Sequence, residues 1–290
     1  MLVGLASFLQ VLILAMVQGL AELLPVSSSA HVVVAEKLMG LDPSAPPMTL
    51  LLVMLHSGTM LAVIVYFWKS WRASYFSSAQ AAKEFGVLLV LATLITGVIG
   101  EALIMVIEKV ALRSSPAAEV EQLFGRLELI APALAAAGIL ILVSGLREKQ
   151  SQASPAPLGV REAGAIGAVQ GLCLPFRGFS RSGATISTGI LAGVAKDQAE
   201  KFSFALAVVL TPAAIGREVL RLVKASHGAG REVLAGAFAP SLLGAALALL
   251  AGLVALKWLS RWLETGRWYL FGIYCLVASA VVAAMHFNGY

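Results

Sequence analysis

Six long apolar segments run through the chain and predict membrane-spanning helices. Each has about 20 residues, the length that an α-helix needs to cross roughly 30 Å of hydrocarbon. They cover residues 49–68, 86–107, 127–146, 202–222, 235–257 and 268–287. The fourth is the weakest, because Thr211 and Pro212 interrupt it and charged residues follow from Arg217 onward. We therefore expect an all-α polytopic membrane protein.

Two further regions, 1–38 and 160–193, have a different pattern. In each, an apolar stretch ends in a break rich in Gly, Pro or Ser, and a second short apolar stretch follows. The pattern is typical of a re-entrant helix pair, which enters the membrane and returns to the same side. Irregular backbone is tolerated at membrane depth only where protein or water covers it. We expect one integral membrane domain over 1–290, with a re-entrant pair and three spans in each half, 1–150 and 151–290.

The two breaks resemble copies of one another. Residues 17–20 and 169–172 both read Val-Gln-Gly-Leu, and each is followed by a proline and a serine cluster. Gln18 and Gln170 are 152 residues apart, close to half of the 290-residue chain, as expected for a duplicated protein. Because three spans are an odd number, the second half should be inverted relative to the first. Inverted repeats place their polar site where the two broken elements meet near the midplane.

Composition and charge support a membrane location. The chain is 59% hydrophobic and 13% charged, with a mean hydropathy of +0.88, whereas soluble proteins need a charged surface. The net charge of +5 comes mostly from loop Lys and Arg, which fits membrane topology better than nucleic-acid binding. Loops on the side away from the termini carry slightly more of them, which places the termini outside. The two cysteines form no ligand or disulfide pattern.

The first break carries a carboxylate, hydroxyls and an imidazole. Gln18 and Glu22 are four residues apart, on one face of a helix. Ser27 and Ser28 follow a proline and can cap the next helix. His31 comes three residues after Ser28, so its imidazole can share a face with that hydroxyl. A carboxylate inside a membrane is costly and indicates function.

The second break carries the features of an anion site. Glycines flank Ser180, Arg181 and Ser182, and Thr185 follows Arg181 by one helical turn. A helix N-terminus offers unpaired N–H groups to a phosphate, and arginine offers a bidentate fork. Arg177, beside the break, could add a second cation. With the first break, these groups indicate phosphoryl transfer on a lipid phosphate whose tail stays in the bilayer.

Packing is the competing interpretation for several of these residues. A serine turn between helices is often only a cap, and a lone membrane Glu or His can join helices through hydrogen bonds. For His56, in the middle of an apolar segment, a core packing role is favoured. For Glu22 and Arg181 a functional role is favoured, because packing alone does little to offset the free-energy cost of burying their charges.

At these residues the chain resembles the bacterial undecaprenyl-diphosphate phosphatases of the BacA/UppP type. The first family motif, (Glu/Gln)-x-x-x-Glu followed by Pro-Val-Ser-Ser-x-x-His, matches residues 18–22 and 25–31 completely. The second, Pro-Gly-x-Ser-Arg-Ser-x-x-Thr, matches residues 178–185, but Phe176 and Arg177 are inserted after its proline. The resemblance extends over nearly the whole chain.

The resemblance implies an enzyme of the bacterial inner membrane. It would hydrolyse undecaprenyl diphosphate to undecaprenyl phosphate and inorganic phosphate, recycling the lipid carrier of peptidoglycan synthesis and conferring bacitracin resistance. The site would face the periplasm or the outside. The family is associated with a divalent cation, Mg²⁺ or Ca²⁺, and a homodimer is left open.

Our hypothesis divides the reaction between the two motifs. Glu22, helped by Gln18, either holds a cation or acts as general base. Ser28 is the candidate nucleophile and His31 its proton-transfer partner, with Ser27, His31 itself or water as the alternatives. Arg181 clamps the diphosphate. The residues expected to contact the diphosphate are Gln18, Ser27, Arg177, Ser180, Arg181, Ser182 and Thr185.

A transporter is the alternative class of protein. Inverted repeats and re-entrant segments are transporter architecture, so the chain could flip undecaprenyl phosphate or a related polyprenyl phosphate across the bilayer.

Overall fold

The computed structural model describes residues 7–41, 46–110, 123, 125–150, 156–225 and 230–289. In these residues the secondary structure is helical, as the apolar pattern predicts. The helices are α1 (Phe8–Leu23), α2 (Ser28–Leu38), α3 (Pro46–Ser74), α4 (Ala79–Val110), α5 (Leu127–Gln150), α6 (Val160–Cys173), α7 (Arg181–Leu191), α8 (Lys196–Ala225), α9 (Gly230–Glu264) and α10 (Tyr269–Phe287).

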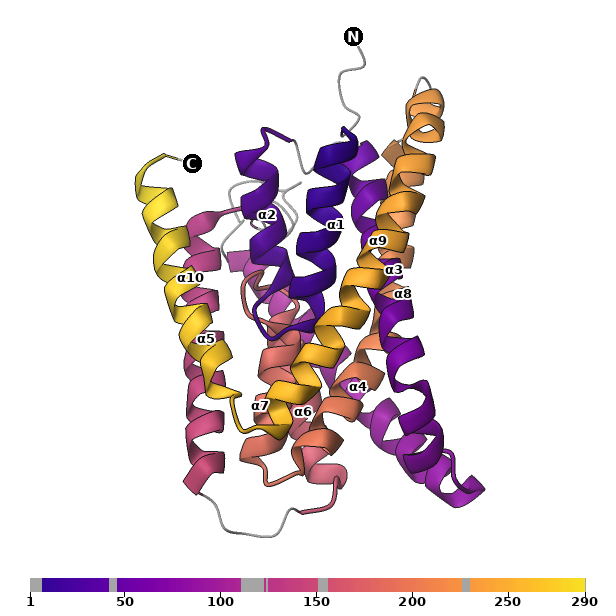
Figure 1. The fold of residues 1–290 in the computed structure, drawn as a ribbon, viewed down its shortest axis with the longest axis vertical. Coiled ribbons are helices and arrows are strands. Elements are labelled where there is room, and N and C mark those ends of the chain that lie inside the picture. Colours follow the sequence, from indigo (N-terminus) through magenta and orange to yellow (C-terminus); the bar gives the residue numbers. More distant parts are fainter. Residues whose placement is uncertain are drawn as a thin grey trace.

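Within the described part of the chain, five helices are long and apolar enough to cross a membrane. They contain Pro47–Ser74, Ala79–Val110, Leu127–Arg147, Gly236–Glu264 and Tyr269–Phe287. These coincide with five of the six predicted segments. The remaining segment, 202–222, falls within α8, which is not among the five. The start of α1 and the end of α10 lie at the same end of the bundle (Figure 1).

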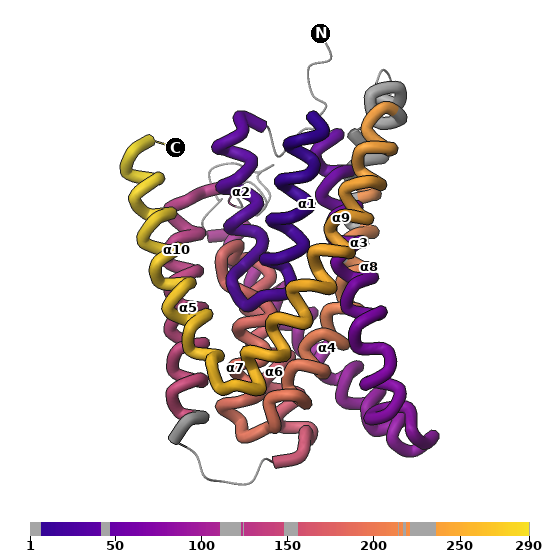
Figure 2. Tube along the Cα trace, in the orientation of Figure 1, coloured from indigo at the N-terminus to yellow at the C-terminus, as the bar shows by residue number. Residues whose placement is uncertain are grey.

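Two short helical hairpins occupy opposite halves of the bundle and turn toward each other at its middle (Figures 1 and 2). One is α1–α2 and the other is α6–α7. Their helices have 16, 11, 14 and 11 residues. At 1.5 Å per residue, each is shorter than the roughly 30 Å of a hydrocarbon core. The two predicted breaks are therefore real interruptions, and each forms the tip of a hairpin.

Local sequence explains where the hairpins turn. Leu24, which precedes Pro25, is extended and ends α1, as a residue before proline prefers. Gly178 has a φ of +102°, which glycine adopts without strain, and it turns the chain ahead of α7. Ser180 then caps α7 by accepting a hydrogen bond from the Gly183 amide at 3.2 Å.

Small residues let the hairpins pack closely on the long helices. A Cβ atom at Gly19 would lie 2.8 Å from the carbonyl oxygen of Ala248, so α1 approaches the backbone of α9. A Cβ at Gly171 would lie 3.0 Å from the carbonyl oxygen of Thr96, so α6 approaches α4 in the same manner. Close contact through small residues is a common way for helices to associate in membranes.

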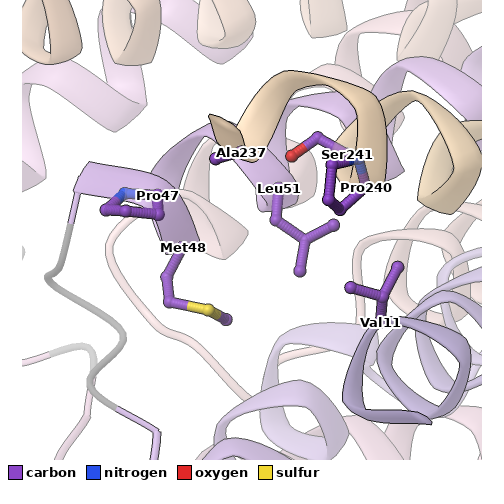
Figure 3. A pocket seen from close by; sticks show the side chains of 7 residues that line it. All are labelled: Val11, Pro47, Met48, Leu51, Ala237, Pro240 and Ser241. Carbon is purple, nitrogen blue, oxygen red and sulfur yellow. The ribbon is translucent and has the colours of Figure 1, made fainter. Parts of the chain in front are cut away.

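A small apolar pocket lies between α1, α3 and α9, separate from the hairpin tips. Its lining residues are Val11, Pro47, Met48, Leu51, Ala237, Pro240 and Ser241 (Figure 3). Glu22 lies three helical turns further along α1 than Val11, about 16 Å by the helical rise. The pocket therefore does not contain the polar residues singled out in the sequence.

Candidate active site

Glu22, in the last turn of α1, is the centre of a polar cluster that joins the two hairpins. Nε2 of Gln18 donates to Oε2 of Glu22 at 3.1 Å. Nη2 of Arg181, in α7, donates to Oε1 of Glu22 at 3.2 Å. Ser28, the first residue of α2, donates its hydroxyl to Oε2. The side chains of Glu22 and Arg181 are 18% and 23% exposed. The structure thus brings together four of the predicted site residues.

Ser27 and Ser28 have different roles in the turn. Ser27 is left-handed, with φ 65°, a conformation that is costly for a residue with a β-carbon. Its hydroxyl pairs with that of Ser29 at 3.2 Å. The turn directs the next hydroxyl, that of Ser28, onto Glu22. Local backbone strain at a functional site is maintained only where the surrounding contacts enforce it.

His31 has other partners than the serine with which it was predicted to act. Its Nδ1 lies 2.7 Å from the carbonyl oxygen of Ser27, which can only accept, so Nδ1 carries the hydrogen. Its Nε2 therefore accepts from the hydroxyl of Tyr274, also at 2.7 Å, and the two rings stack. The hydroxyl of Ser28 is bonded to Glu22 instead. Tyr274 of α10 was not singled out in the sequence.

The tips of the two hairpins are hydrogen-bonded to each other. Ser182 donates its hydroxyl to the carbonyl oxygen of Leu24 at 3.2 Å. The amide of Gly178 donates to the hydroxyl of Ser29 at 3.4 Å. These bonds cross between segments about 150 residues apart in the sequence, and they hold Arg181 against Glu22.

The remaining predicted residues of the second motif lie around this contact. Thr185 donates to the carbonyl oxygen of Arg181 at 2.8 Å and pairs with the hydroxyl of Ser203 at 2.6 Å. With the cap formed by Ser180 and the bond made by Ser182, the hydroxyls of this motif hold the hairpin in place. Arg177 is half-buried in the turn before α7. Its contact with phosphate stays a prediction.

Arg181 has an unused donor. Its Nη1 is buried and has no hydrogen-bond partner among the described residues, although Nη2 is bound to Glu22. Buried donors are nearly always paired in folded proteins. An anion is the natural partner for a guanidinium, and a phosphate oxygen would satisfy this group.

His56 of α3 lies in the cluster, so its interpretation as a core packing residue is wrong. Its Nε2 is 3.8 Å from Oε2 of Glu22, and its side chain is 42% exposed. Its Nδ1 lies 2.8 Å from the carbonyl oxygen of Leu52. No local motif marks it, because it reaches the site only through the packing of α3 beside α1.

The contacts of Glu22 bear on the two roles predicted for it, general base and metal ligand. Both of its oxygens already accept hydrogen bonds, and the guanidinium of Arg181 would repel a cation bound at Oε1. Where the structure describes the chain, no group of three or more His, Cys, Asp or Glu is placed to hold a metal ion. Both roles predicted for Glu22, cation ligand and general base, stay predictions.

Comparison with known proteins agrees with the motifs. The family described as bacitracin resistance protein BacA matches residues 11–281. The chain belongs to the BacA family. It is 57% identical to undecaprenyl-diphosphatase 2 of Acinetobacter baylyi over 96% of this chain and 97% of that protein. It is 35% identical to undecaprenyl-diphosphatase 2 of Burkholderia orbicola, over 91% and 92% of the two chains, and 31% identical to the undecaprenyl-diphosphatase of Korarchaeum cryptofilum, over 95% and 98%.

The BacA motifs coincide with the polar cluster. The first motif ends α1 and begins α2, and the second begins α7. The two motifs touch where Arg181 donates to Glu22 and where the amide of Gly178 donates to the hydroxyl of Ser29. Family membership and geometry therefore point to the same part of the molecule.

Proposed function

We infer that this chain is an undecaprenyl-diphosphatase, which hydrolyses undecaprenyl diphosphate to undecaprenyl phosphate and inorganic phosphate. The observation that carries this inference is that Glu22 contacts both Ser28, in its own hairpin, and Arg181, in the other hairpin. A carboxylate on a hydroxyl activates a nucleophile, and a guanidinium with a free donor binds phosphate. Relatives over nearly the full chain bear that activity in their names.

Ser28 is the proposed nucleophile. Its oxygen attacks the terminal phosphorus of the diphosphate, its proton passes to Glu22, and the bond to the bridging oxygen breaks, releasing undecaprenyl phosphate. Water then hydrolyses the phosphoserine. Ser28 is preferred to Ser27, because the hydroxyl of Ser27 is paired with Ser29. It is preferred to His31, because both ring nitrogens of His31 have other partners.

An inverted repeat explains why the two motifs meet. Gly171 follows Gly19 by 152 residues, and Ala248 follows Thr96 by the same number. Gly19 packs on the carbonyl of Ala248, and Gly171 packs on that of Thr96. Equivalent positions in the two halves therefore make equivalent contacts. This supports α6 as the counterpart of α1, and α4 as the counterpart of α9. In this proposal α8 is the sixth span and both hairpins are re-entrant.

The proposed location is the bacterial inner membrane, with the termini and the opening of the site on the periplasmic side. The distribution of loop Lys and Arg supports this orientation. The polyprenyl tail would remain among the membrane lipids, while the diphosphate reaches the hairpin tips. A homodimer stays a prediction.

The divalent cation is proposed to arrive with the substrate. Mg²⁺ commonly keeps several waters and binds through substrate phosphates with few protein ligands. The occupied oxygens of Glu22 support this arrangement over a resident ion. Removing Mg²⁺ or Ca²⁺ with EDTA should stop turnover, yet leave the thermal unfolding midpoint of the substrate-free protein unchanged. A lowered midpoint would indicate a resident metal.

Phosphate release from a polyprenyl diphosphate by the purified protein in detergent tests the function. Wild type should turn over with Mg²⁺ or Ca²⁺ supplied, and Ser28→Ala should lose at least about 10³-fold in kcat, as loss of a nucleophile does. Ser78→Ala, which removes an exposed hydroxyl from the turn ahead of α4, is the matched control and should retain most of the activity. An inactive wild type that moves undecaprenyl phosphate between leaflets of a vesicle would establish the transporter instead.

A further inference from the structure

We propose that His56 is the proton relay behind Glu22, receiving the proton that Glu22 takes from Ser28. The proposal rests on the proposed function, because it assigns a further residue to the same reaction. It differs from the role predicted for His31, and it draws on a histidine that neither motif contains.

A single oxygen atom connects the three groups. Oε2 of Glu22 accepts the hydroxyl of Ser28, and it is also the oxygen that faces Nε2 of His56 at 3.8 Å. The other oxygen, Oε1, is occupied by Arg181. A proton that leaves Ser28 therefore arrives on the atom nearest to the imidazole of His56.

The tautomer of His56 suits it to accept a proton. Its Nδ1 lies 2.8 Å from the carbonyl oxygen of Leu52, and because a carbonyl only accepts, Nδ1 carries the hydrogen. In the neutral ring, Nε2 then presents a lone pair toward Glu22. His31 has the same tautomer, but the hydroxyl of Tyr274 already occupies its Nε2.

Packing and exposure fit a relay to solvent. Gly58, two residues after His56, lies against the backbone carbonyl of Ala245 in α9, which fixes the position of α3. The His56 side chain is 42% exposed, more than twice the 18% of Glu22, so protein covers its ring less than it covers the carboxylate. The 3.8 Å gap is longer than a hydrogen bond, and one bridging water or a small ring movement closes it.

The proton balance over one turnover is complete. When Ser28 bonds to phosphorus and the bridging P–O bond breaks, the proton of Ser28 moves to Glu22 and then to Nε2 of His56. The imidazolium keeps its Nδ1 bond to Leu52 and releases the proton to water. Glu22 is again ionised and takes a proton from the water that attacks the phosphoserine. That proton returns to Ser28 as inorganic phosphate leaves.

The charged groups that the structure describes around this relay are few. Glu22 of α1 faces His56 directly, and Arg181 of α7 lies on the far side of the carboxylate. The described residues of α9 beside this part of α3 are uncharged, among them Gly244, Ala245 and Leu247. Apart from His56 itself, Glu22 and Arg181 are therefore the described charged groups that can affect the relay.

The test is the pH profile of kcat for His56→Gln and His56→Ala in detergent. Wild type should lose activity on the acidic side of its profile, because an imidazole that already carries both protons cannot accept another. We expect kcat to fall at least tenfold in both variants, within the range of general acid–base catalysis, with KM changed less than threefold and the acidic fall flattened. Added imidazole should restore part of the activity of His56→Ala.

His286→Gln is the matched control. Its Nδ1 lies 3.7 Å from Glu128 and its side chain is 40% exposed, so it repeats the pairing and exposure of His56 away from the site. Its kcat and pH profile should equal those of wild type. Because the profile is a ratio within one variant, a partly unfolded sample does not imitate the expected result.

Failure of the relay is distinguishable from failure of the function. If wild type and Ser28→Ala behave as the proposed function requires, while His56→Gln keeps the wild-type kcat and acidic fall, only the relay is overturned. An inactive wild type overturns the proposed function and the relay together.

Discussion

A methyl group at Gly19 should displace Glu22 and reduce turnover without contacting substrate. The Cβ of an alanine there would lie 2.5 Å from the Cβ of Ala251 and 2.8 Å from the carbonyl oxygen of Ala248. Ordinary carbon contacts are about 3.5 to 4.0 Å. Helix α1 must therefore move away from α9 by about 1 Å. Glu22 lies three residues further along the same helix and moves with it.

The expected cost can be divided into stability and catalysis. Overpacking of this kind costs about 1–3 kcal/mol of folding stability. A misplacement of about 1 Å in a catalytic group costs about 10²-fold in rate. Gly19→Ala should therefore lower kcat by one to two orders of magnitude, while a folded fraction persists at low temperature. Phosphate release and thermal unfolding in the same detergent measure the two effects.

Two further variants identify the cause. Gly97→Ala adds the same methyl group to α4 at a position with nothing within 4 Å, and it should leave kcat unchanged. Gly19→Ala combined with Ala251→Gly removes the nearest obstacle and should recover part of the lost activity, whereas the carbonyl of Ala248 remains. If Gly19→Ala turns over like wild type, the close packing of α1 on α9 does not position Glu22.

Three other changes test individual contacts of the site. Arg181→Lys keeps the charge but loses the planar fork, so kcat/KM should fall about 10²-fold; an unchanged value would contradict the phosphate clamp. Ser27→Gly removes the β-carbon from a left-handed residue and should raise the free energy of unfolding by about 1 kcal/mol, seen as a higher unfolding midpoint. Tyr274→Phe leaves Nε2 of His31 without its donor and should cost about 1 kcal/mol of stability, with kcat within threefold of wild type; a larger fall in kcat would return His31 to the proton path.

Periodicity and composition predicted the architecture well, because both follow from local rules. Apolar segments long enough to span a membrane became long helices, and the breaks around Pro25 and Gly178 became the hairpin tips. Proline and glycine act within a few residues, so their effect is visible in the sequence. The meeting of the two breaks was also predicted, from the likeness of their sequences, whereas the direct pairing of Glu22 with Arg181 was not.

Partners set by tertiary packing could not be predicted in the same way. His56 stands alone in an apolar segment, and its approach to Glu22 depends on how α3 fits beside α1 and α9. Tyr274 is 243 residues from His31, on the last helix. Neither has a neighbour in the sequence that would distinguish it from an ordinary packing residue. Their roles become visible only when the distances between helices are known.

The difference between the two hairpin tips has a physical consequence for the reaction. The proposed nucleophile and base need a rigid turn between them, and the strained Ser27 and the bond from Ser28 to Glu22 supply one within a single hairpin. The proposed phosphate clamp needs a donor that is available when substrate binds, and Nη1 of Arg181, on the other hairpin, has no partner among the described residues. Bonds between the tips, such as that from Ser182 to Leu24, fix the distance between the two. Activation of the nucleophile and binding of the diphosphate can therefore be disrupted separately. Changes at the α1–α2 tip should act on kcat, and changes at the α6–α7 tip should act on KM as well.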